Sequence, residues 1–131
     1  MIDNITQLKV LDLLYDVGKT IKSMQSDPAF RKILSIYGFK TGGDLKAHEM
    51  LVNGLHKITP YISVFSEETP HLIEERPSQY WLIDPIDGTS SWHDGFEGYV
   101  TKSGFIHKEL CIYIIMAMNS IIIFSKSLSG S

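Results

Sequence analysis

Asp84 and Asp87 are carboxylates that stand three positions apart, separated by Pro85 and Ile86. Because a proline ring fixes φ and removes an amide donor, the backbone after Asp84 is predicted to turn rigidly rather than continue as a helix. The two carboxylates and the free carbonyl of Ile86 can then point at one spot. Mg²⁺ suits such a group of hard oxygens, because it binds through few carboxylates and keeps other positions for water and phosphate. We therefore predict a magnesium site at this turn.

Gly88 and Thr89 follow the second aspartate directly, and they predict a phosphate site beside the metal. A glycine lets a ligand approach the backbone closely, and successive amides at the start of a helix form a cradle for anions. The segment 90–97 is polar and is expected to begin as a short helix. Asp-Gly-Thr alone is an ordinary polar turn, so the prediction depends on the whole run 80–89.

Glu67 is a third acidic residue that follows a short apolar segment. Residues 62–65 are predicted to form a strand that ends at Ser66-Glu67-Glu68, much as the apolar strand 81–83 ends at Asp84. Two strands that end in acids at one sheet edge would gather carboxylates, and such a cluster implies a bound cation or raised pKa values. A solvated acidic turn is the simpler interpretation of the Glu-Glu pair alone.

Two amphipathic helices are expected to support these segments. Residues 3–24 form the first, capped by Asp3 or Asn4, and residues 45–58 form the second, with Asp44 as its N-cap. The predicted buried stripe of the first helix comprises Ile5, Leu8, Leu11, Leu14, Val17 and Ile21, and that of the second comprises Ala47, Leu51, Leu55 and Ile58.

Three further strands are predicted after the central turn, at residues 98–106, 111–116 and 121–125, joined by hairpin connections. The order of two helices followed by consecutive strands predicts an α+β fold. In that fold, two N-terminal helices pack on one face of a mostly antiparallel sheet.

The composition is that of one globular domain, with 131 residues of which 44% are hydrophobic. The net charge of −3 argues against a nucleic-acid partner, and an acidic protein that handles phosphate esters needs a cation in its site. Cys111 is the sole cysteine, so an internal disulfide is impossible and a reducing, cytoplasmic setting is expected. Asn119 and Ser120 interrupt the most apolar run, 110–123, which is too short and polar for a transmembrane segment.

The run from Trp81 to Thr89 resembles the signature of the inositol monophosphatase superfamily, Trp-x-(Ile/Val)-Asp-Pro-(Ile/Leu)-Asp-Gly-Thr. Members of that superfamily are Mg²⁺-dependent phosphomonoesterases. A second likeness has the right order and spacing: residues 44–48, then 58–60, then 64–68 are similar to its CysQ branch, the 3′(2′),5′-bisphosphate nucleotidases.

The resemblance implies hydrolysis by an activated water, without a covalent intermediate, and Mg²⁺ as the cofactor. It also implies a role for each matching position. The implied metal ligands are Glu67, Asp84, the carbonyl of Ile86, and Asp87; the implied catalytic residues are Asp44 and Thr89; and the implied phosphate-binding amides are those of Gly88, Thr89 and Ser90.

Family members are about twice as long as this chain and supply a further Asp ligand from their second half. The resemblance therefore implies the first half of an αβαβα layered sandwich, with a metal- and phosphate-binding domain at residues 1–126, a tail at 127–131, and no C-terminal domain. Such a half would leave a strand edge open to pairing with another copy of the chain, so a homo-oligomer is expected as one outcome.

The activity implied is hydrolysis of adenosine 3′,5′-bisphosphate to AMP and phosphate, with a small phosphorylated molecule as the partner. An inositol-1-monophosphatase is the alternative within the family. A different class of function also stays open, namely a truncated, inactive fragment that at most binds metal or associates. A cytoplasmic location is expected, with peripheral contact to a membrane left open.

Overall fold

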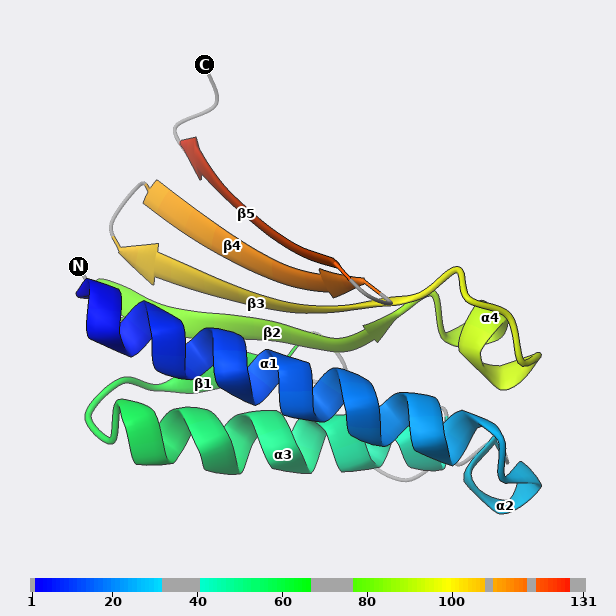
Figure 1. Ribbon diagram of the computed structural model, residues 1–131. Helices are drawn as coiled ribbons and strands as arrows, with labels where there is room; N and C mark the ends of the chain where they lie inside the picture. The colour runs from blue at the N-terminus through cyan, green and yellow to red at the C-terminus, as the bar shows by residue number, and fades with distance from the viewer. Residues whose placement is uncertain (1, 32–40, 67–76, 108–109, 118–119, 128–131) are drawn as a thin grey trace.

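The computed structural model describes residues 2–31, 41–66, 77–107, 110–117 and 120–127 (Figure 1). Helices occupy the N-terminal part, and most of the sheet follows them. The elements are α1 (Asn4–Gln25), α2 (Pro28–Arg31), α3 (Gly42–Ile58), β1 (Val64–Ser66), β2 (Gln79–Asp87), α4 (Thr89–His93), β3 (Val100–His107), β4 (Leu110–Ala117) and β5 (Ser120–Ser127).

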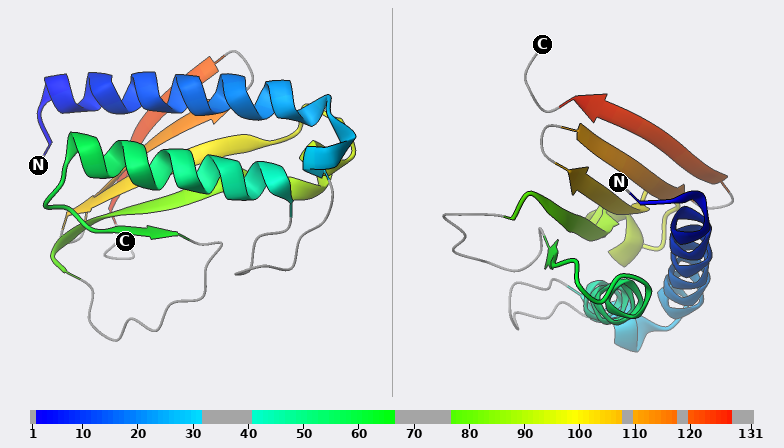
Figure 2. Two further views of the ribbon diagram at one scale, coloured as in Figure 1. Left: turned by 90° about the horizontal axis from the view of Figure 1, so that it is seen from below. Right: turned by 90° about the vertical axis from the view of Figure 1, so that its left-hand side faces the viewer.

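The strands form one five-stranded sheet in the order β1-β2-β3-β4-β5. The β1–β2 pair is parallel, and the three remaining pairs are antiparallel. Helices α1 and α3 lie side by side on one face of this sheet (Figure 2). The predicted α+β arrangement is thus confirmed. Within the described residues, no helix has the length and apolar character needed to cross a bilayer.

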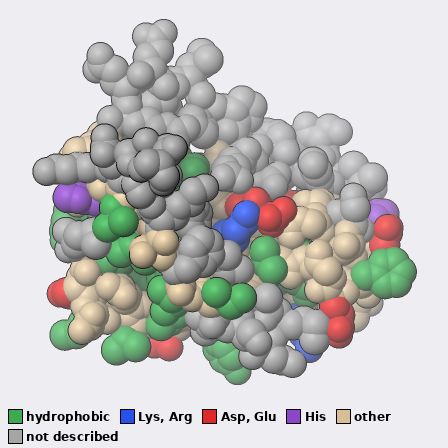
Figure 3. Space-filling model, turned by 90° about the horizontal axis from the view of Figure 1, so that it is seen from above, with side chains coloured by type: hydrophobic (Ala, Val, Ile, Leu, Met, Phe, Trp, Pro, Cys, Tyr) green, Lys and Arg blue, Asp and Glu red, His purple; other side chains and the backbone are tan. Residues whose placement is uncertain are grey.

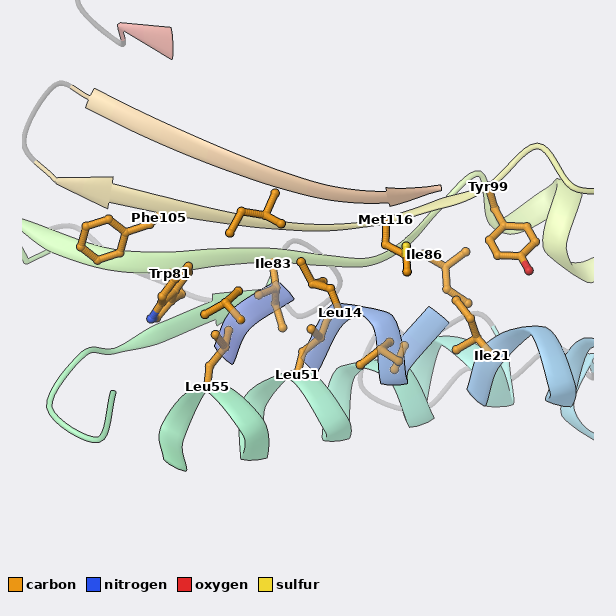
Figure 4. Packing of buried hydrophobic residues seen from close by; sticks show 14 of the residues in the cluster. Leu14, Ile21, Leu51, Leu55, Trp81, Ile83, Ile86, Tyr99, Phe105 and Met116 are labelled. Carbon is orange, nitrogen blue, oxygen red and sulfur yellow. The ribbon is translucent and has the colours of Figure 1, made fainter. Parts of the chain in front are cut away.

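The hydrophobic core lies between the two long helices and the sheet (Figure 4). The side chain of Trp81 on β2 is fully buried, and its ring lies 5.1 Å from that of Phe105 on β3. The indole Nε1 of Trp81 donates a 2.9 Å hydrogen bond to Oγ1 of Thr59, which directly follows α3. This bond satisfies a polar group that burial would otherwise leave without a partner.

The predicted stripe of α1 is correct in its second half and wrong in its first. Leu14, Val17 and Ile21 are buried, but Ile5 and Leu8 remain 66% and 60% exposed. Each residue turns an α-helix by about 100°, so Ile5 lies about 180° from Leu14, on the opposite face. Val10, about 40° from Leu14, completes the buried stripe instead.

Helix α3 begins earlier than predicted, and Asp44 is not its N-cap. Thr41 is the N-cap, and Asp44 stands at N3 of a capping box in which each side chain accepts from the other residue's backbone amide. The sequence Thr-Gly-Gly-Asp offers both residues as caps, and the reciprocal box satisfies two free amides, whereas a lone Asp44 cap satisfies one. The buried stripe of Ala47, Leu51 and Leu55 is confirmed.

Strand β2 is longer than predicted, since it continues through Asp87 and does not turn away after Ile83. The pairing with β3 shifts register between Asp84 and Asp87, because Asp84 faces Lys102 and Asp87 faces Val100. Two residues of β2 therefore stand opposite one residue of β3, which is a β-bulge. Such a bulge accommodates a proline within a strand, because Pro85 has no amide to give to the ladder.

Candidate metal and phosphate site

The bulge in β2 places the two aspartates on one face of the sheet. Side chains three apart in a regular strand point to opposite faces. Here the extra residue of the bulge restores the alternation, since Asp84 and Asp87 face Lys102 and Val100, which are two apart on β3. The hydroxyl Oγ1 of Thr101 donates a 2.8 Å hydrogen bond to the carbonyl of Pro85 and so holds the bulge from β3. The sequence predicted that the carboxylates share a side, but through a turn.

Gly88 joins β2 to α4 in a conformation that favours glycine, with φ at +95°. A Cβ at this position would lie 2.5 Å from the carbonyl oxygen of Gly98. No side chain fits there without moving backbone, because real Cβ atoms do not approach that closely. The carbonyl of Gly88 accepts from the amide of Trp92, so the chain enters α4 directly. The short helix predicted after the aspartates is confirmed.

Thr89, the first residue of α4, links the turn to α3. Its Oγ1 lies 3.2 Å from Oδ1 of Asp44 and 3.2 Å from the carbonyl oxygen of Ile86. A threonine hydroxyl carries a single proton, so it donates to one of these acceptors at a time. The structure thus brings together Asp44, Ile86 and Thr89, three residues to which the sequence assigned roles.

The carboxylate of Asp44 is fully buried and held in place by Thr41. Its Oδ2 accepts a 2.6 Å hydrogen bond from Oγ1 of Thr41 and a 3.0 Å bond from the Thr41 amide. Its Oδ1 faces Thr89, as described above. Hydrogen bonds to a carboxylate stabilise its charged form in a buried position. Thr41 was missed as a contributor, although the spacing Thr-x-x-Asp is itself a capping-box signal.

Trp92 fixes the position of α4 against the helical layer. Its indole Nε1 donates a 3.1 Å hydrogen bond to the carbonyl of Ile21 on α1. The amide of Gln25 donates to the carbonyls of Trp92 and Phe96, at 3.1 and 2.9 Å. A Cβ on Gly43 would come within 2.4 Å of the Trp92 ring, so the start of α3 packs closely on α4. No local pattern indicates these contacts of Trp92 and Gln25, because they join segments far apart in the chain.

Asp87 carries an ion pair that the sequence did not suggest. The Nζ of Lys102 lies 2.8 Å from Oδ2 of Asp87, and their side chains are 28% and 52% exposed. On the sheet face away from the helices, a basic and an acidic group of side chains lie side by side (Figure 3). No sequence signal could have found this pair, because it depends on the register of β2 against β3.

The other predicted site residues are Asp84, Ser90 and Glu67. Asp84 is partly buried on β2, and Ser90 belongs to α4. Glu67 lies outside the described residues, directly after the end of β1, whose last residue Ser66 pairs with Ile83. In the described part of the chain, no three His, Cys, Asp or Glu side chains gather in a way that could hold a metal.

The chemistry of the available donors nevertheless fits a divalent cation. Asp84, Asp87 and the Ile86 carbonyl offer only oxygen, which Mg²⁺ prefers. The Ile86 carbonyl keeps a second lone pair when Thr89 donates to it. The ammonium of Lys102 on Asp87 shows that a positive charge is accommodated at this carboxylate.

His48 lies on α3 one turn after Asp44 and is half-buried. Burial lowers the pKa of its imidazole, and the nearby negative charge of Glu49 opposes this only in part. A histidine with a lowered pKa is neutral at neutral pH, so it adds no positive charge beside the site.

A separate open depression of about 750 Å³ lies among α2, Asp94 and the last residue of α4. Its lining residues are Pro28, Ala29, Arg31, His93 and Asp94, and none of these has a role in the predicted chemistry. We therefore place the candidate site at the start of α4 and not in this depression.

The sequence model of the inositol monophosphatase family matches residues 14–122, which is most of the chain. This protein belongs to the inositol monophosphatase family. The superfamily resemblance drawn from Trp81 to Thr89 is thereby confirmed.

Curated relatives of the CysQ branch match part of the chain. The 3′(2′),5′-bisphosphate nucleotidase CysQ of Salmonella typhimurium is 44% identical over 54 residues, which are 40% of this chain and 22% of that protein. CysQ of Haemophilus influenzae is 32% identical over 87 residues, which are 64% of this chain and 32% of that protein.

Solved structures confirm the fold over nearly the whole chain. The extragenic suppressor protein SuhB of Bartonella henselae superposes with a TM-score of 0.76 at 18% identity, covering 98% of this chain and 50% of that one. The chain therefore spans about half the length of this structural relative.

Proposed function

We propose that this chain carries the metal- and phosphate-binding half of a Mg²⁺-dependent phosphomonoesterase. The observation that carries the proposal is the hydroxyl of Thr89, which stands between the buried carboxylate of Asp44 and the carbonyl of Ile86. In this proposal the hydroxyl at the start of α4, next in the chain to two aspartates on one sheet face, would act as the proton-transfer group. Family membership supports the same reaction class.

In this proposal Glu67, Asp84, Asp87 and the Ile86 carbonyl hold Mg²⁺. A divalent ion supplies positive charge for the phosphoryl oxygens and for the attacking water. The amides of Gly88, Thr89 and Ser90 would hold the phosphate, because the first amides of an α-helix have no acceptor within the helix itself.

Asp44 and Thr89 would position the water and remove its proton. A water that donates to Oγ1 of Thr89 can pass a proton along the Thr89–Asp44 hydrogen bond, since Thr89 donates its own proton to Oδ1. Asp44 can receive it because Thr41 holds that carboxylate in a fixed position through two hydrogen bonds. The network needs no covalent intermediate, and positioning supplies much of the rate.

The substrate we propose is a 3′(2′),5′-nucleoside bisphosphate such as adenosine 3′,5′-bisphosphate, because the curated relatives above have that activity in their names. An inositol phosphate is the second candidate, in view of the family as a whole. The residues of the candidate site would contact the metal and the phosphate rather than the leaving group, so activity on a panel of phosphate esters separates the two substrates.

An inactive metal-binding or self-associating fragment is the alternative from another class, because the chain spans about half the length of its structural relative. The edge strand β5 supports association, since Ile122 and Ile123 are both about half exposed. The division into a domain at 1–126 and a tail, the cytoplasmic location and the oligomeric state remain proposals.

The test is Mg²⁺-dependent phosphate release by the purified chain. Asp87→Asn should abolish it, because one charged ligand is lost. Thr89→Val should lower the rate by about 10²–10⁴-fold, the usual contribution of a proton-transfer group, whereas Thr89→Ser keeps the hydroxyl and most of the rate. Release that survives Asp87→Asn would refute the site, and no release by the parent chain would favour the fragment.

A further inference from the structure

The ion pair between Lys102 and Asp87 puts a lysine on a carboxylate to which we assign a metal. The Nζ–Oδ2 distance of 2.8 Å is that of a charge-assisted hydrogen bond. Lys102 also stands directly opposite Asp84 in the register of β2 and β3. Residues paired in an antiparallel ladder share a face of the sheet, so this lysine lies on the same face as Asp84, with Asp87 at the diagonal position.

The bulge explains why Lys102 lies on the same face of the sheet as both aspartates. Without its extra residue, Asp87 would point to the other side of the sheet from Asp84 and Lys102. The bulge therefore brings the charges of Asp84, Asp87 and Lys102 onto the same face of the sheet. Lysine has a long flexible stem and a compact charge, so its ammonium can reach Asp87 and can also leave it.

We propose that Lys102 is an internal competitor for the divalent cation at Asp87. The ammonium holds Oδ2 of Asp87, and its charge would repel a metal ion bound to either oxygen of that carboxylate at such short distance. Binding of the metal therefore requires Lys102 to release Asp87. Because the Asp87 side chain is half exposed and the Lys102 side chain is about a quarter exposed, both partners have room to exchange.

Lys102 then raises the concentration of metal at which the site becomes occupied. With the lysine in place, the aspartates are partly neutralised in the absence of metal, and the divalent ion binds more weakly than the carboxylates alone would allow. This inference rests on the proposed metal site but not on turnover, so binding measurements test it directly.

The experiment is calorimetric titration of the full chain with Mn²⁺, and with Mg²⁺ in parallel. Lys102→Met removes the charge with a side chain of similar length, and we expect about tenfold tighter binding, which is the effect of about 1.4 kcal/mol. Lys102→Arg keeps the charge and should bind as weakly as the parent. Lys57→Met, at the other end of α3 from Asp44, removes an equal charge roughly 20 Å away along the helix and controls for net charge.

A second comparison tests Lys102→Met in a protein that also carries Asp87→Asn. In that background Lys102→Met should change metal affinity much less, because the shared ligand is gone. Equal affinity of the parent and Lys102→Met proteins would overturn the inference while leaving the metal site and the phosphatase proposal standing. Tightening of the same size in Lys57→Met would also overturn it. If neither the parent nor Lys102→Met binds either ion, the inference and the metal site fall together.

Discussion

Gly88 allows a stringent test of the geometry at the start of α4, because a second glycine provides a matched control. Gly88 and Gly95 both have positive φ, at +95° and +86°. A Cβ on Gly88 would lie 2.5 Å from the Gly98 carbonyl oxygen, whereas one on Gly95 would meet only a side-chain atom of Arg31 at 3.4 Å. Alanine at the two positions therefore separates backbone strain from steric clash.

The expected costs follow from these contacts. Positive φ costs an alanine about 1–2 kcal/mol, and the reduced freedom of the unfolded chain returns about 0.4–1 kcal/mol. Gly95→Ala should therefore lose on the order of 1 kcal/mol of the free energy of unfolding. Gly88→Ala should lose about 2–4 kcal/mol, because the clash is with backbone that cannot rotate away and overpacking adds about 1–3 kcal/mol.

The assay is urea unfolding followed by tryptophan fluorescence, with the free energy extrapolated to water for the parent and both variants. The Gly88→Ala protein should also lose phosphate release, since the amides at the start of α4 move with the turn. Equal losses for the two variants, or a Gly88→Ala protein as stable as the parent, would refute the close approach of Gly88 to Gly98.

Two further predictions concern the core and the helix beside the site. Trp81→Phe removes the donor to Thr59 Oγ1 in a buried place and should lower the free energy of unfolding by about 1–3 kcal/mol in urea titration, an effect that Thr59→Ser should not reproduce. Burial lowers the pKa of His48 from its ordinary value of 6.5. As the pH is lowered below about 6.5, the imidazole is therefore protonated in the unfolded state before it is protonated in the folded state, and the free energy of unfolding decreases. His48→Gln should flatten that part of a urea-midpoint profile measured between about pH 5 and pH 8, and an unchanged slope would contradict the assignment.

Much of the fold was accessible from local patterns. The long N-terminal helix and its cap at Asp3 follow from apolar spacing and a capping residue, and both are observed. The buried face of that helix was only half predicted, because Ile5 and Leu8 are as apolar as Val10 and only the sheet decides which of them is covered. A helix with apolar residues on two faces does not reveal which face meets its partner.

In the candidate site, too, the features carried by contiguous residues were predicted and those set by strand pairing were not. The site at residues 84–89 was predicted from a contiguous run, and the roles of these residues stay predictions; the structure adds that Thr89 lies beside Asp44. The bulge escaped prediction because Pro85 also suits a sharp turn. Lys102 escaped because its contact with Asp87 depends on a strand register that no local pattern encodes.

Trp92 and Gln25 connect the element that begins at the candidate site, α4, to the C-terminal end of α1. The end of α4 and the segment after it are held by the last turns of a helix some seventy positions earlier, through the bond from Trp92 to Ile21 and the carbonyls of Trp92 and Phe96 that Gln25 binds. Loosening the C-terminal end of α1 would therefore loosen α4, which begins at Thr89, without touching any residue to which we assign the metal. During synthesis, the N-terminal helix must wait for Phe96 to emerge before this brace can form.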